Sequence, residues 1–168
     1  MRRTRSGRLL PTTIACAGAI IALGASPTLA TAAPPHTIIK AELVGSMPEP
    51  MSPVIADVNP GGLPWVNGPS RVRVREDGRI KVDITRLVVP PPRGTGVNPV
   101  AAVVATLVCD GAVHSSTTPF PLNAAGNGRT SQRIAVPRHC EDPAVLIQPA
   151  ANRGAYIAST VADDDHDD

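Results

Sequence analysis

The chain has 168 residues, with 16 lysines and arginines against 14 aspartates and glutamates, and only one Trp, one Tyr and one Phe. This length is enough for one ordinary domain. The near balance of charge and the scarcity of aromatic side chains argue against a nucleic-acid-binding protein, which needs a basic surface and rings on which bases can stack.

The first 32 residues have the pattern of a secretory signal peptide. Four arginines within the first eight residues precede an apolar stretch (9–23), and small residues follow it. We therefore expect cleavage near Ala32 or Ala33 and a secreted protein. An uncleaved anchor and a lipoprotein attached at Cys16 are the alternatives. No later segment is long and apolar enough to be a transmembrane segment after signal removal.

Charge is distributed unevenly over the residues that would remain. Without residues 1–32 there are 12 basic and 14 acidic residues, and five of the acids fall in the last six positions, DDDHDD (163–168). We expect residues 33–162 to form one mildly basic β domain and residues 163–168 to be an acidic, disordered tail. The tail could instead hold calcium or another cation loosely.

Cys109 and Cys140 are the only cysteines that follow the expected signal peptide. In an oxidising compartment a single remaining pair favours a disulfide. Closing this loop of about 30 residues should stabilise the fold by about 3 to 4 kcal/mol.

The expected domain consists of short runs with the pattern of β-strands. In HTIIKAELV (36–44), apolar and charged residues alternate with the period of a half-buried strand. Residues 99–109 are apolar on both faces, so we expect that strand to lie centrally. The pattern predicts an all-β fold, a two-sheet antiparallel β-sandwich that is Ig-like in the broad sense, with about eight strands. The other expected strands cover residues 70–75, 79–89, 100–109, 112–118, 129–136, 144–148 and 155–161.

The segment RVRVREDGRIKVDI (71–84) predicts a hairpin with a three-residue loop at 76–78. A type I turn followed by Gly78 in the left-handed region pairs Val74 with Ile80 and Arg73 with Lys81. The cations then form one outer stripe, the arginine stripe: Arg71, Arg73, Arg75, Arg79 and Lys81. This stripe is either a solvated sheet face or an anion-binding surface for an acidic polysaccharide, a cell-wall component or the acidic tail.

A second candidate site is the corner that a disulfide would create. It would gather oxygen and nitrogen ligands from Asp110, His114, His139, Glu141 and Asp142. Such residues could support a metal-dependent enzyme, although their spacing matches no familiar ligand pattern and Asp and Glu are common in turns. The chain has no nucleophile elbow, Walker loop or paired-histidine zinc motif, so we expect no catalytic residue, cofactor or resident metal.

Five segments carry a resemblance to other proteins: VNPGGLPWV (58–66), RVREDGRIKVDITRLVV (73–89), NPVAAVVATLVCDG (98–111), HCEDPAVLIQP (139–149) and AYIAST (155–160). With these segments the chain resembles small exported β-rich proteins of high-GC Gram-positive bacteria, a group with no established function. The preference for Arg, Ala, Val, Gly and Pro over Lys and Asn agrees with such an actinobacterial source. The resemblance implies a β-rich exported domain and no catalytic residue.

Together these patterns predict an exported, non-enzymatic binding or cell-envelope-associated module whose ligand the sequence does not identify. The alternative is a metal-dependent enzyme with its site at the Asp110/His139 corner. Trp65 either stacks on a sugar ring or plugs the open end of the sandwich.

Overall fold

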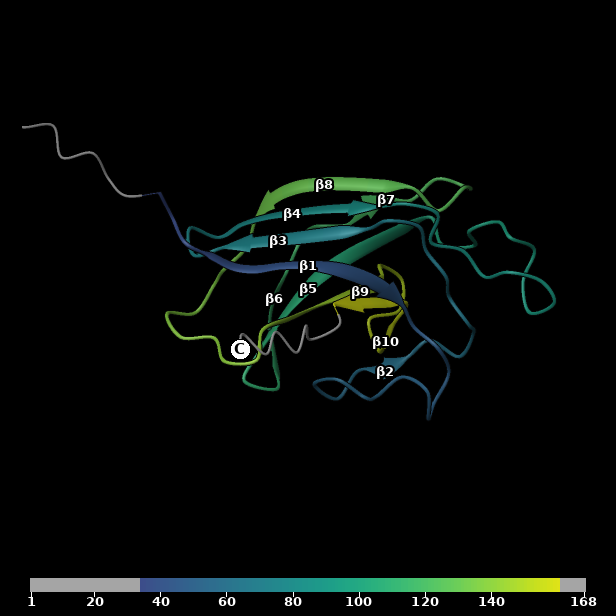
Figure 1. Cartoon of the computed structure of the whole chain (residues 1–168), viewed down its shortest axis with the longest axis horizontal. Helices are drawn as coiled ribbons and strands as arrows, with labels where there is room; N and C mark the ends of the chain where they lie inside the picture. The colour runs from purple at the N-terminus through teal and green to yellow at the C-terminus, as the bar shows by residue number, and fades with distance from the viewer. Residues whose placement is uncertain (1–33, 161–168) are drawn as a thin grey trace, which may run out of the picture. The chain divides into compact units, whose positions relative to one another are not determined.

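The computed structural model describes residues 34–160, and these residues form strands, turns and loops without a helix (Figure 1). No membrane-crossing helix is therefore present within that range. The signal peptide expected at 1–32 and the tail expected at 163–168 lie outside the described residues. The strands are β1 (Thr37–Gly45), β2 (Asn59–Pro60), β3 (Arg71–Arg75), β4 (Arg79–Ile84), β5 (Ala102–Cys109), β6 (Ala112–Ser116), β7 (Phe120–Pro121), β8 (Gly128–Arg133), β9 (Ala144–Pro149), β10 (Ala155–Tyr156) and β11 (Ala158–Thr160).

Most of these strands belong to one continuous antiparallel sheet. Its order is β6-β5-β9-β11-β1-β3-β4-β8, with β7 beside β5, and a separate parallel pair joins β2 to β10. The sheet curls into a half-barrel, in which β1, β3, β4 and β8 lie side by side and β5 and β9 cross at an angle to them (Figure 1). The all-β expectation is confirmed, but this pairing gives one curled sheet rather than two separate ones.

Each of the eight expected runs contains a strand. Where the observed bounds of a strand differ from the expected ones, the backbone is irregular. β4 ends at Ile84 instead of residue 89, because Arg86 adopts a φ of 53° and donates its N–H to the Asn127 side chain. The last run is divided at Ile157, whose N–H donates to the carbonyl oxygen of Ile147. β2 and β7 were not expected, since two residues are too few to show a periodic pattern.

The concave side of the sheet holds the hydrophobic core. Trp65, only 5% exposed, packs into this core, which favours the packing alternative over an exposed ring that stacks on a sugar. Burying each aliphatic side chain contributes about 1.5 to 3 kcal/mol to the free energy of folding. This core is therefore the main interaction that holds the sheet in shape, including its outer, solvent-exposed face. Its central side chains are Val72, Val74, Ile80, Val82, Val103, Ala105, Leu107, Val145 and Ile147.

β5 is buried on both faces, as its apolar residues on both faces predicted, and the one polar side chain in the strand, Thr106, is buried as well. It pairs with β9 along one edge and with β6 and β7 along the other. On the face of β5 away from the main core, Val108 packs with Val58, Leu146 and Tyr156 in a second small cluster. This cluster attaches the proline-rich segment before β3 to the sheet.

Tyr156 gives the fold an expected sensitivity to alkali. Its hydroxyl donates to the carbonyl oxygen of Pro53 at 2.6 Å, and burial raises the pKa of Tyr156 above the ordinary value of 10.0. The folded state therefore holds this proton more tightly than the unfolded state, and stability present below pH 10 is lost as pH rises through the raised pKa.

We expect Tyr156→Phe to remove this alkaline loss of stability, measured as the melting temperature against pH. Because Tyr156 is the only tyrosine, ultraviolet absorbance of the tyrosinate ion reports its titration directly. A titration at the ordinary tyrosine pKa in the folded protein would contradict the prediction.

Candidate anion-binding face

The hairpin of β3 and β4 has the predicted register. Val74 pairs with Ile80 and Arg73 pairs with Lys81 across the two strands. Gly78 has a φ of 82°, and its N–H donates to the carbonyl oxygen of Arg75 at 2.9 Å, which closes the three-residue loop. The apolar side chains are buried and the arginine stripe lies on the outer face, as expected.

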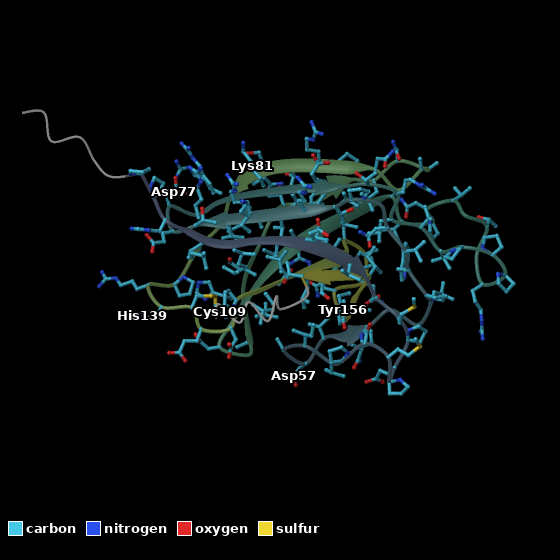
Figure 2. All side chains as sticks on the ribbon, in the orientation of Figure 1. Asp57, Asp77, Lys81, Cys109, His139 and Tyr156 are labelled. Atoms are coloured by element: carbon cyan, nitrogen blue, oxygen red, sulfur yellow. A yellow bond between two sulfur atoms is a disulfide. The ribbon has the colours of Figure 1, made fainter. Side chains whose placement is uncertain are left out.

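The outer face extends beyond this hairpin, because β1 pairs with β3 and β8 pairs with β4. Lys81 points outward from β4, on the side of the sheet away from Tyr156 and Cys109, and side-chain nitrogen atoms gather along that side (Figure 2). Four cations lie elsewhere in residues 34–160, at Arg86, Arg93, Arg138 and Arg153. The outer face carries the other eight: Lys40, Arg71, Arg73, Arg75, Arg79, Lys81, Arg129 and Arg133.

Sequence reasoning missed three of these cations: Lys40, Arg129 and Arg133. Their strands were expected, and the alternation within each strand already put these side chains on an exposed face. Which strands would lie beside the hairpin was not predictable, because those partners are distant in the sequence.

One line of cross-strand neighbours alternates in sign, and we call it the alternating row: Glu42, Arg71, Asp83 and Arg129. Arg129 and Asp83 form an ion pair at 2.9 Å, with both side chains more than half exposed. An exposed pair of this kind contributes little, on the order of 0.2 to 1 kcal/mol. The row nevertheless shows the usual arrangement, in which opposite charges face each other.

The next line of neighbours contains no acid. Lys40 lies opposite Arg73, Arg73 opposite Lys81, and Lys81 opposite Ser131. We call these four residues the cationic row. None of its three cations forms an ion pair within residues 34–160. Like charges directly opposite one another destabilise a sheet, so this row costs stability that an alternating row would not.

The third line lies at the loop end of the hairpin and is partly neutralised. Arg79 forms an ion pair with Asp77 at 3.4 Å, and Arg133 donates to the backbone oxygen of Asp77 at 3.0 Å. Arg75 lies beside them, where the loop begins. The strongest uncompensated charge of the described face is therefore in the cationic row.

Two depressions follow these rows across the strands. The larger, of about 980 Å³, lies between the alternating row and the cationic row, and its floor is the sheet backbone at Ala41, Val72, Val82 and Thr130, because the Val72 and Val82 side chains point into the core on the other side. We call it the cross-strand groove. A smaller one of about 230 Å³ is bounded by Arg73, Arg75, Arg79 and Lys81. The face thus offers shape as well as charge.

At the corner formed by Cys109 and Cys140, the cysteines lie as expected for a disulfide, but the acidic and histidine side chains that the structure describes there do not form a group of metal ligands. Cys109 and Cys140 are at disulfide bonding distance, with Cα atoms 4.9 Å apart. Asp110 uses its carboxylate to accept a hydrogen bond from the Glu141 N–H at 2.9 Å, so it holds a loop in place. Residues 34–160 contain no group of three His, Cys, Asp or Glu side chains that could hold a metal ion.

No family model, curated protein or solved structure matches the chain. The resemblance to exported actinobacterial proteins therefore stays a prediction. The chemistry of the outer face is the remaining guide to function.

Proposed function

We propose that this protein is an exported, non-enzymatic binding module that holds an anionic polymer against the cationic row. The observation that carries the proposal is the placement of Lys40, Arg73 and Lys81 directly opposite one another on three neighbouring strands. An ordinary solvated face would keep the sheet equally soluble with alternating signs, as the adjacent row does. An anionic ligand offsets the repulsion among the three cations.

Export is supported by two independent features. Residues 1–32 have a signal-peptide pattern, and the two cysteines at bonding distance are typical of an oxidising compartment. Outside the cell, an anionic polymer is a common component of envelopes and matrices. Association with the cell envelope then follows from the same contact, with no need for a catalytic group.

We also propose that the curled sheet acts as a two-layer sandwich. β1, β3, β4 and β8 form the layer that carries the cationic row, and β5, β9 and β11 form the layer behind it. The two contribute side chains to one core, including Val82 from the first and Leu107 from the second. A packed second layer keeps the outer face rigid, which reduces the entropy lost on binding.

Reversing two charges of the cationic row tests the function. We expect Arg73→Glu/Lys81→Glu to weaken binding to heparin at low salt by about tenfold or more, because two charged contacts become repulsive. The single change Lys81→Glu should weaken heparin binding and yet raise the free energy of unfolding by about 0.2 to 1 kcal/mol, since it puts an acid opposite Arg73. Isothermal titration and chemical unfolding measure the two effects.

The matched control is Arg93→Glu/Arg153→Glu, which changes the net charge equally at two exposed positions outside the outer face. This control separates a binding face from general attraction by net charge. Equal weakening by the two double variants would contradict the proposed function and leave the cationic row as the solvated side of a sheet.

A further inference from the structure

The two walls of the cross-strand groove have different chemistry. One wall is the cationic row, where Lys40, Arg73 and Lys81 face the groove. The other wall contains two carboxylates, Glu42 and Asp83, which alternate with arginines. A groove built only to attract negative charge would not place acids along one side.

Ionised carboxylates accept hydrogen bonds and cannot donate them. Arg129 already donates to one Asp83 oxygen, so a ligand that covers the two carboxylates must bring donors for Glu42 and for the remaining accepting capacity of Asp83, or these oxygens lose their water without replacement. Inorganic polyphosphate has no donor to offer and would also be repelled. A sugar polymer with acidic groups has many hydroxyl donors along its length.

We infer that the ligand of the cross-strand groove is a linear acidic polysaccharide, bound with its acidic groups toward the cationic row and its hydroxyls toward Glu42 and Asp83. This inference rests on the proposed function and names the class of polymer. The carboxylates act as selectivity groups, because they reject polyanions that lack hydroxyl donors.

The direction of the polymer follows from the direction of the groove. The lining residues come from β1, β3, β4 and β8, so the groove crosses the strands. Neighbouring strands lie about 4.8 Å apart, close to the length of one sugar ring in a linear chain. Consecutive sugars can thus present one acidic group to each cation in turn, which a polymer lying along a single strand would not do.

The experiment compares two probes, polygalacturonate oligosaccharides and long-chain inorganic polyphosphate, on the full-length protein and two double variants. Glu42→Gln/Asp83→Asn removes both charges and keeps hydrogen-bond acceptors. Glu42→Met/Asp83→Leu removes the same charges and the acceptors. Arg129 loses its partner in both, so the pair differs in hydrogen-bonding ability: the amides both accept and donate, whereas the apolar side chains do not donate and accept at most weakly. Circular dichroism and melting curves check that both variants fold.

We expect the amide variant to bind polygalacturonate more tightly than the apolar variant, by about fivefold for each hydrogen bond lost. Polyphosphate should bind both variants more tightly than it binds the unchanged protein. It can gain only from the amide N–H donors, so its preference for the amide variant should be smaller than that of polygalacturonate. The inference is overturned if the preference for the amide variant is no larger for polygalacturonate than for polyphosphate, or if the unchanged protein prefers polyphosphate at matched charge.

A second pair of double variants tests the anion-binding face separately from the choice of polysaccharide as its ligand. Arg73→Gln/Lys81→Gln is compared with Arg93→Gln/Arg153→Gln on both probes. If only the first pair weakens binding while the acceptor variants show no difference, the anion-binding face stands and the polysaccharide assignment fails. If both pairs have equal effects, the proposed function and the inference fail together.

Discussion

Replacing both Cys109 and Cys140 with alanine should lower the free energy of unfolding by about 3 to 4 kcal/mol. The two residues are 31 positions apart in the sequence, and in the chain-entropy model a bond across a loop of that length restricts the unfolded chain by about this amount. Denaturant unfolding, followed by circular dichroism, measures the change.

The strands should survive this replacement, because the loop that contains Cys140 has other attachments. Asp110 and Glu141 exchange two hydrogen bonds, one through backbone atoms and one through the Asp110 carboxylate, each at 2.9 Å. The far-ultraviolet spectrum should therefore stay unchanged while the transition moves to lower denaturant.

The unchanged protein in reductant is the control for the side-chain replacement itself. It should unfold at nearly the same denaturant concentration as the alanine variant. Alkylation of both cysteines in the folded protein without reductant would contradict the bond, as would equal stability of the oxidised and reduced forms.

The hairpin at 71–84 was predictable because everything that determines it lies within one short segment. A shift of one residue would move every valine of β3 to the solvent side, so the alternation selected one register. The three-residue loop then required a left-handed residue at its end, and Gly78 has that conformation.

The cationic row was only partly predictable, because it depends on pairing between distant segments. Lys40 reaches Arg73 through the pairing of β1 with β3, and Ser131 reaches Lys81 through β8. Alternation tells which side chains share a face of one strand, but it does not say which strands are neighbours. For this reason the sequence predicted a five-residue stripe and not a groove.

The continuous sheet was missed for a similar reason. β11 is only three residues long, yet it pairs with β9 on one side and with β1 on the other. Its run at 155–161 predicted a strand, but a strand this short carries no information about joining two groups of strands. Without β11, the remaining pairings would form two separate sheets, one of β6, β5 and β9 with β7, and one of β1, β3, β4 and β8.

Gly78→Val should destabilise the fold by about 2 to 5 kcal/mol, through two separate costs. The left-handed backbone at a φ of 82° is unfavourable for a β-branched residue. A Cβ at this position would also collide with the carbonyl oxygen of Ile134. The two residues are already in contact, because the Ile134 N–H donates to the Gly78 carbonyl oxygen at 2.9 Å. The loop of the hairpin is therefore held against the chain that follows β8.

Two other glycines separate these costs. Gly96 has a φ of 76° and open space where a Cβ would lie, so Gly96→Val carries the backbone cost alone. Gly62 has open space and no left-handed φ, so Gly62→Val should change the free energy of unfolding by less than about 0.5 kcal/mol. Gly68→Val should also cost less than Gly78→Val, since the nearest atom is a Thr85 methyl carbon at 3.2 Å. We expect the loss measured by denaturant unfolding to decrease from Gly78 to Gly96 to Gly62. Equal losses at Gly78 and Gly96 would mean that the loop does not approach Ile134, and that the end of the arginine stripe is less firmly held than its register implies.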